Sequence, residues 1–240
     1  MHIKTKTITT IIILVLLLVV PPIIYSYVTK GYNNFIKLQV AGEKDSNGND
    51  HKISDFSFIN QDGVVINNDS MLGNIYIADF FFTTCPTICP TMTKNMAYVQ
   101  EKLSVYPNIK FLSHTVNPET DTPERFLEYI DEMKQDNIMI DLKNWDFVTG
   151  KKNEIYDVAK SYFVSAFDED PLNLHGGGFL HTEYFILIDK EGRVRSGLRK
   201  DGNPRGAYDG TNDAQMKDLV NDVKVLMAEY KRPKRTKRKW

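Results

Sequence analysis

The chain of 240 residues contains two cysteines, Cys85 and Cys89, which stand four residues apart. An apolar stretch typical of a buried strand precedes them, and a proline follows each one, at Pro86 and Pro90. Residues four apart share one face of a helix, so a helix that begins here would direct both sulfur atoms the same way. The amides and the dipole at a helix N-terminus favour thiolates. The pair therefore indicates either disulfide exchange or binding of a soft metal, above all Cu(I).

Two alternative interpretations of the pair are a structural disulfide and two small core residues. A disulfide between Cys85 and Cys89 would close a very short loop, and loop-closure entropy would then add little stability. The prolines that bracket the pair argue against two core cysteines that are neighbours by chance.

A metal bound by two thiolates needs a further ligand, and the chain has five histidines. His181 is the candidate, because it directly precedes a predicted strand, residues 182–188. A glycine-rich loop, residues 165–180, comes before it and could hold the imidazole over the end of the sheet that carries Cys85. His175 lies within that loop and is not expected to be a ligand.

The other side chains of ligand type are expected to be structural. His114 lies inside a predicted strand, where a histidine is usually hydrogen-bonded. Met92 and Met96 continue the face of the cysteines, but methionines at helical spacing usually belong to a core. His51 is expected to be solvated, and His2 precedes the predicted membrane segment.

The composition is that of a globular protein, with 42% hydrophobic and 25% charged residues. Two cysteines are too few for a disulfide scaffold or a cysteine-rich metal module. The net charge of −1 hides an asymmetry, because residues 31–230 carry 20 basic and 31 acidic side chains whereas both ends carry no acid. An acidic body between basic ends argues against a nucleic-acid-binding domain.

Residues 7–29 contain no charged side chain. A helix of this length spans about 34 Å, enough to cross the hydrocarbon core of a bilayer. A cleaved signal peptide is the alternative, since Lys4 and Lys6 precede a ten-residue apolar run. No Ala-x-Ala-like cleavage site follows, and no nearby cysteine could carry a lipid. We therefore predict that residues 1–30 form a single-pass anchor in the cytoplasmic membrane, with the rest of the chain on the extracytoplasmic side.

Strands alternate with helices in the rest of the chain, which predicts an α/β fold with a central sheet. Hairpins at 56–66 and 182–196 indicate that the sheet is mixed. Further strands are expected at 74–82 and 109–116, and helices are expected up to residue 105, from residue 123, at 151–163 and at 213–230. The predicted organisation is a linker over 31–50, a domain over 51–230 and a basic tail over 231–240.

The basic tail, residues 231–240, has seven Lys or Arg and no acid. It matches a nuclear-localisation pattern, but a membrane anchor argues against that role. A solvated segment is the expected state. Contact with an anionic lipid surface or with an acidic partner is the alternative.

These motifs resemble the SCO/SenC family of membrane-anchored, thioredoxin-like copper proteins. The resemblance covers roughly residues 50–230 and implies a thioredoxin-like fold, in which helices flank a central mixed sheet. The matching features are the N-terminal anchor, the element Cys85-Pro-Thr-Ile-Cys89-Pro, the segment Val116-Asn-Pro-Glu-Thr-Asp-Thr-Pro123, and His181 leading into Tyr184-Phe-Ile-Leu-Ile-Asp-Lys-Glu-Gly192.

The resemblance implies that Cys85, Cys89 and His181 bind Cu(I) or Cu(II). It also implies a role in assembling the dinuclear copper centre of cytochrome c oxidase, as copper donor or as thiol reductant. The expected partners are the copper-bearing oxidase subunit or another cuproprotein, and an upstream copper donor. Many members of the family have Asp where this chain has Thr87, so this chain lacks a negative charge between the cysteines.

A membrane-anchored thiol–disulfide oxidoreductase of the same fold is the second hypothesis, with Cys85 and Cys89 as the redox-active pair. The spacing argues against it, because thioredoxins use Cys-x-x-Cys. His181 also argues against it, since oxidoreductases of this fold usually have a cis-proline where this chain has Leu180-His181-Thr182. A thiol peroxidase is a third, weaker hypothesis. The main prediction is a copper-binding assembly factor that is not a turnover enzyme.

Overall fold

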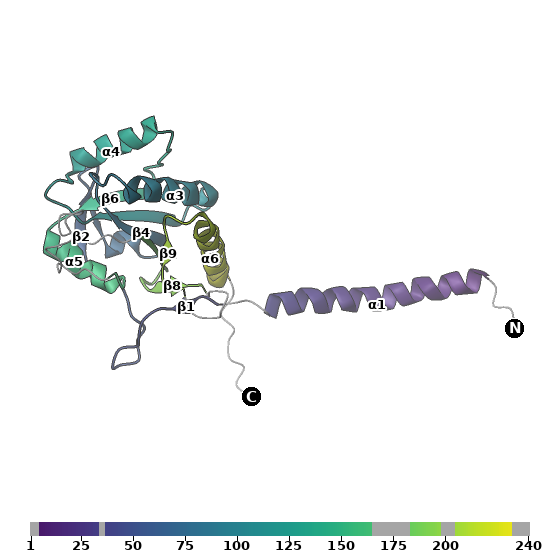
Figure 1. Cartoon of the computed structure of the whole chain (residues 1–240). Coiled ribbons are helices and arrows are strands. Elements are labelled where there is room, and N and C mark those ends of the chain that lie inside the picture. Colours follow the sequence, from purple (N-terminus) through teal and green to yellow (C-terminus); the bar gives the residue numbers. More distant parts are fainter. Residues whose placement is uncertain (1–4, 34–36, 165–182, 198–204, 232–240) are drawn as a thin grey trace. The chain divides into compact units, whose positions relative to one another are not determined.

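The computed structural model describes residues 5–33, 37–164, 183–197 and 205–231. The chain divides into two units, residues 1–37 and residues 38–240. The first unit contains helix α1, Thr5–Asn33, drawn in purple in Figure 1. The segment Ile8–Ser26 of this helix has a mean hydropathy of 2.7 and is long enough to cross a membrane. A signal sequence can have the same length and hydropathy. The helix continues through Pro21 and Pro22.

A mixed β-sheet forms the centre of the second unit, in the strand order β1-β8-β7-β4-β5-β6-β2-β3, with β9 also paired to β7. Strand β4 is parallel to β5, and β5 is parallel to β6, whereas the other pairs are antiparallel. The mixed sheet expected from the two hairpins is therefore confirmed. The strands are β1 (Gln39–Val40), β2 (Ser57–Asn60), β3 (Val65–Asn67), β4 (Ile75–Phe81), β5 (Ile109–Thr115), β6 (Trp145–Thr149), β7 (Tyr184–Ile188), β8 (Val194–Ser196) and β9 (Tyr208–Asp209).

Helices cover both faces of this sheet, as Figure 1 shows. Neighbouring residues of β4 point to opposite faces of the sheet. On one face, Phe81 packs on Phe126 and Tyr129 of the helix Pro123–Gln135. On the other face, Phe80 packs on Tyr162, which follows the helix Lys152–Ser161. The sheet thus has an apolar layer on each side, which explains why every residue of β4 is buried and all but Asp79 are apolar. The helices are α2 (Asn68–Met71), α3 (Ile88–Leu103), α4 (Pro123–Gln135), α5 (Lys152–Ser161) and α6 (Asp213–Lys231).

The expected helices and hairpins are present within a few residues of their predicted bounds. Thr122 caps α4 as expected, because its hydroxyl accepts a hydrogen bond from the Arg125 amide at 3.3 Å. Strand β6 was not predicted. The strand has only five residues, and so short a stretch gives no recognisable strand pattern in the sequence.

The folded unit begins earlier than the sequence suggested. Residues 38–50 were assigned to a linker, but Leu38 is buried and β1 pairs with β8, so the compact unit starts at Leu38. The contacts that fix this segment come from residues more than 150 positions away, such as Arg195. Local polarity carries no information about such contacts.

Candidate metal centre

Strand β4 leads directly to the two cysteines. All seven of its residues are buried, and it lies between β5 and β7 in the sheet. Cys85 follows in a short loop and donates its amide hydrogen bond to the Phe82 carbonyl at 3.2 Å. Helix α3 begins only at Ile88, so Cys89 is its second residue and Cys85 lies before it.

This placement corrects the expectation that both cysteines lie on the first helical turn. Thr87 is the residue before the helix, with φ −126° and ψ −80°, and this non-helical conformation separates Cys85 from α3. Pro90 is tolerated in the first turn, because amide groups there have no intrahelical acceptor. The two sulfur atoms therefore come from a loop and from a helix start.

Both thiols are free and almost fully covered, with 4% of Cys85 and 3% of Cys89 exposed. Burial raises the pKa of the Cys85 thiol, but hydrogen bonds from the Thr87 and Cys89 amides and from the Cys89 thiol outweigh it and leave the pKa below its ordinary value. Burial raises the pKa of the Cys89 thiol, to which the charge of Cys85 adds. Cys85 is therefore the more acidic thiol of the pair, and Cys89 holds its proton more tightly.

The predicted third ligand, His181, lies outside the described residues, as does His175. The described chain resumes at Glu183, and β7 begins at Tyr184. Ala78 of β4 pairs with Ile186 of the antiparallel β7, so the start of β7 lies at the end of β4 that leads to the cysteines. Within the parts of the chain that the structure describes, no cluster of three His, Cys, Asp or Glu side chains is found.

His114 is structural, as expected, but it is not hydrogen-bonded. It lies in β5, is fully buried, and neither ring nitrogen has a hydrogen-bond partner. Aromatic rings surround it instead, with the ring of Phe80 stacked at 5.0 Å. Burial lowers the pKa of His114 to about 3, so the ring is neutral. The aromatic neighbours are Phe56, Phe58, Phe80 and Tyr162.

Two further expectations can be compared with the structure. Met92 and Met96 are buried in the core on α3, which confirms that they are packing residues. His51 was expected to be solvated, but it is half-buried, with its ring on Phe163 and its Nε2 at 2.8 Å from the Ser161 carbonyl. This correction follows from the folding of residues 38–50 into the domain.

Asp79 is a buried acid near the site that the sequence reasoning missed. It lies in β4, and its carboxylate accepts a hydrogen bond from Ser113 Oγ at 2.5 Å. Burial raises the pKa of Asp79 to about 7, and its negative charge contributes to the raised pKa of Cys89. A signal was present in the sequence, since Asp79 is the one charged residue in the apolar run 75–82.

Asp121 fixes the loop in front of Cys85. Its fully buried carboxylate accepts hydrogen bonds from the Thr83 hydroxyl at 2.5 Å, the Thr83 amide at 3.2 Å and the Thr115 hydroxyl at 2.5 Å. Arg125 Nε donates to the Thr83 hydroxyl at 3.2 Å. The ends of β4 and β5 and the start of α4 therefore meet at the Asp121 carboxylate, which holds Thr83, two residues before Cys85. The sequence reasoning used this segment as a helix start and as part of the family resemblance, and it gave Asp121 no role at the site.

Comparisons with known proteins agree with this architecture. The profile of the family described as SCO1/SenC matches residues 44–214. The SCO1 protein homolog of Bacillus subtilis is 31% identical over 180 residues, which cover 72% of this chain and 82% of that protein.

Two solved structures have the same fold. BsSco, described as a member of the Sco family of cytochrome c oxidase assembly proteins with a disulfide switch, has 30% identity and a TM-score of 0.59, over 74% of this chain and 94% of that chain. The copper-bound ScoI of Arabidopsis thaliana has 25% identity and a TM-score of 0.51. The match covers 71% of this chain and 97% of that chain. With its thioredoxin-like mixed sheet and its two cysteines where β4 leads into α3, the chain belongs to the SCO1/SenC family.

Proposed function

We propose that this chain binds one copper ion through Cys85, Cys89 and His181 and assists assembly of the dinuclear copper centre of cytochrome c oxidase. The observation that carries the proposal is the pair of free thiols between β4 and α3, one of which has a lowered pKa. Thiolates are soft donors that suit Cu(I), and an imidazole adds the nitrogen donor that suits Cu(II). The donor set therefore fits copper in both oxidation states.

Two comparisons support this proposal. The Arabidopsis relative was solved with copper bound, and BsSco is described as belonging to a family of oxidase assembly proteins. The partners proposed for this chain are the copper-bearing oxidase subunit and an upstream copper donor. Helix α1 would hold the chain in the cytoplasmic membrane as an uncleaved anchor, with the copper-binding domain on the extracytoplasmic side.

The chain's own residues suit a transfer step. The lowered pKa of Cys85 makes it the thiol that releases its proton more readily, whereas the raised pKa of Cys89 means that its proton is harder to remove before it can act as a second sulfur donor. The reverse step, protonation of Cys89, weakens its hold on a metal and favours transfer. The copper ion itself would be the group that is transferred to the partner protein.

The experiment that tests the proposal measures oxidase assembly in cells that lack this chain. We expect membranes from these cells to lose cytochrome c oxidase activity and the absorption of the dinuclear copper centre, while haem content stays normal. The wild-type chain should restore both, and Cys85→Ser should restore neither. The variant His51→Ala is the matched control, because it removes an imidazole that bonds Ser161 and lies outside the proposed ligand set. Normal copper-centre absorption in the deletion cells would contradict the proposal.

Thiol–disulfide exchange is the second candidate, and the unequal thiols favour it. The Cys85 thiolate would attack a target disulfide, Cys89 would then displace the target thiol, and the target would leave as a dithiol while Cys85 and Cys89 form a disulfide. Reduction of an oxidised copper site in the oxidase subunit is one such reaction. If the chain acts only by disulfide exchange, His181→Ala should restore oxidase assembly fully in cells that lack the chain. If the chain acts by binding copper through His181, this variant should not restore assembly.

A further inference from the structure

The start of β7 is tied to helix α3, which carries Cys89, by two hydrogen bonds in series. Asn95 of α3 donates from Nδ2 to the Gly210 carbonyl at 2.7 Å. The Gly210 amide in turn donates to the Glu183 carbonyl at 2.5 Å, just before β7 begins at Tyr184. Asn95 is buried, so water competes little for its donor group. The backbone at Glu183 is therefore fixed relative to α3.

Gly210 is needed for this close approach. Any side chain at position 210 would place its Cβ 2.8 Å from Cε1 of Phe185 and 3.0 Å from the Glu183 carbonyl oxygen. Glycine is the residue that lets two backbones come this close. Strand β9 directly before it pairs with β7, with Tyr184 opposite Asp209. The turn that follows β9 thus lies against the start of β7.

The turn after β9 is itself held in place by side chains. The Asp209 carboxylate accepts hydrogen bonds from the Thr211 amide at 2.8 Å and from the Thr211 hydroxyl at 2.6 Å. The Asp209 amide donates to Gln215 Oε1 at 3.0 Å, which joins the turn to helix α6. Because the turn is bound to α6, Gly210 holds the Glu183 backbone to a fixed point.

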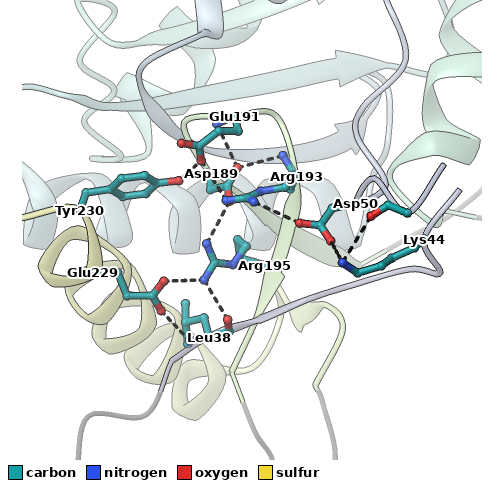
Figure 2. Close-up of polar contacts among 10 residues, drawn as sticks. Leu38, Lys44, Asp50, Asp189, Glu191, Arg193, Arg195, Glu229 and Tyr230 are labelled. Carbon is teal, nitrogen blue, oxygen red and sulfur yellow. Dashed lines mark hydrogen bonds and ion pairs between the residues drawn. The ribbon is translucent and has the colours of Figure 1, made fainter. Parts of the chain in front are cut away.

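The other end of β7 is held separately, by the buried charges that Figure 2 shows. Asp189, directly after β7, is paired with Arg193 at 2.7 Å and with Arg195 at 2.9 Å. Arg195 is also paired with Glu229 of α6 at 2.6 Å. The last residue of β7 pairs with the second residue of β4, so this network lies at the end of the sheet away from the cysteines.

We propose that Asn95 and Gly210 are positioning residues for His181, the imidazole ligand of the proposed copper site. His181 stands two residues before Glu183 in the sequence, so covalent geometry keeps their Cα atoms within about 7 Å of each other. Tying the Glu183 backbone to α3 narrows the space that the imidazole can occupy relative to Cys89 of the same helix. Preorganisation of this kind strengthens binding, because less conformational freedom is lost when the ligands meet the ion. This role rests on the proposed copper site and adds two residues that act through His181.

Copper titration of the reduced full chain in detergent tests this role with Asn95→Leu and Gly210→Ala. Asn95→Leu removes the donor but keeps a branched side chain of similar shape, and Gly210→Ala forces the turn away from β7. Two thiolates suffice for Cu(I), whereas Cu(II) requires the nitrogen donor in addition. We therefore expect each variant to weaken Cu(II) binding at least about tenfold and Cu(I) binding less than about threefold, with an altered copper(II) electron paramagnetic resonance spectrum.

Glu229→Gln is the matched control, because it weakens the network at the other end of the same strand. It should destabilise the metal-free chain and leave both copper affinities within about twofold of wild type, since distant sites act independently. Amide hydrogen exchange of the metal-free chain gives a readout without copper. Asn95→Leu should accelerate exchange of the Gly210 amide, and Glu229→Gln should not.

A double variant separates positioning from a general loss of the fold. In a chain that carries His181→Ala, adding Asn95→Leu should weaken Cu(II) binding no further, because the group that Asn95 positions is gone. Equal losses for Cu(I) and Cu(II), or a further loss in the double variant, would overturn the positioning role.

Failure of the positioning role and failure of the copper site give different results. If His181→Ala binds Cu(II) weakly while Asn95→Leu and Gly210→Ala bind it like wild type, the copper site stands and the positioning role is wrong. If His181→Ala itself binds Cu(II) like wild type, the three-ligand site has failed and the positioning role fails with it.

Discussion

Cys85 and Cys89 are chemically unequal although only three residues separate them. The Thr87 and Cys89 amides and the Cys89 thiol donate to the Cys85 sulfur and lower its pKa, while burial raises the pKa of Cys89. The inequality arises from the loop between β4 and α3, because Cys85 lies outside the helix and faces its first amides. A pair on one regular helical turn would lack this asymmetry.

The first prediction concerns the order of reaction of the two thiols. With a slight excess of iodoacetamide at neutral pH, we expect Cys85 to be alkylated at least about tenfold faster than Cys89, because the thiolate is the nucleophile. Peptide mass spectrometry of the reduced, metal-free chain measures both rates. Cys89→Ser should keep the fast phase and Cys85→Ser should lose it. Faster labelling of Cys89 would show that the assignment of the thiolate is wrong.

The second prediction concerns His114. Its pKa is lowered to about 3 in the folded chain, so the unfolded chain binds a proton more readily between that pH and about 6.5. The contribution to stability is complete above about pH 6.5 and falls by up to about 1.4 kcal/mol per pH unit as the pH decreases. His114→Phe, which fits the aromatic surroundings, should remove this dependence.

Denaturant unfolding of wild type and His114→Phe at several pH values measures the effect. The variant should be more stable by about 1 kcal/mol at pH 7, since two unpaired buried nitrogens are removed. Its advantage should grow by roughly 1–2 kcal/mol on going to pH 5. Because other titrating groups such as Asp79 are common to both chains, they cancel in the difference. A difference that is constant with pH would contradict the account of His114.

At the scale of elements, the junction of β4, β5 and α4 positions the cysteine loop. Asp121 joins Thr83, Thr115 and, through the Thr83 hydroxyl, Arg125. The Val116 amide also bonds the Phe81 carbonyl at 2.9 Å, so the two strand ends are tied twice. The position of Thr83, where the loop that carries Cys85 begins, is therefore fixed by these hydrogen bonds.

The third prediction is that Asp121→Asn disturbs the site as well as the fold. The amide replaces an acceptor by a donor that faces hydroxyl groups, and we expect a loss of about 1–3 kcal/mol in stability. We also expect an altered copper(II) electron paramagnetic resonance spectrum and weaker copper binding. Asp146→Asn is the control, because Asp146 of β6 accepts a hydrogen bond from Asn60 of β2, away from the cysteine loop. An unchanged copper spectrum in folded Asp121→Asn would limit Asp121 to a structural role.

Elements that rest on local patterns could be predicted from the sequence. The apolar run of β4, the helix that starts at residue 123 and the helix at 213–230 rest on local signals, and the structure confirms them. Contacts between distant segments could not be predicted. Leu38 is held by Glu229, so its assignment to a linker was wrong, and His51 is held by Ser161 and Phe163, so the expectation that it is solvated was wrong.

The candidate site divides in the same way. The cysteine pair and its position after a buried strand follow from residue types and spacing. The unequal pKa values do not, because they depend on where the helix begins and on buried charges such as Asp79. The position of His181 is still a prediction, supported by the register of β7 against β4.

At the scale of the whole molecule, the domain has two functional ends. The cysteines follow the carboxyl end of β4, whereas the pole formed by Leu38 and the last turn of α6 is where the chain enters and leaves. Strand β8 and helix α6 hold that pole through Arg195 and Glu229. Because the cysteine pair and the contacts of Leu38 involve different residues, substitutions at one end should leave the other intact.

The central claim is that Cys85, Cys89 and His181 form one copper site, and a copper titration of the reduced full chain in detergent tests it most directly. We predict one copper ion per chain, severe loss of binding in Cys85→Ser and Cys89→Ser, and a loss in His181→Ala that is greater for Cu(II) than for Cu(I). Metal-free unfolding of His181→Ala should match wild type, while the stabilisation by copper should shrink. His51→Ala should bind copper like wild type. Stoichiometric binding that survives His181→Ala in both oxidation states would contradict the three-ligand site.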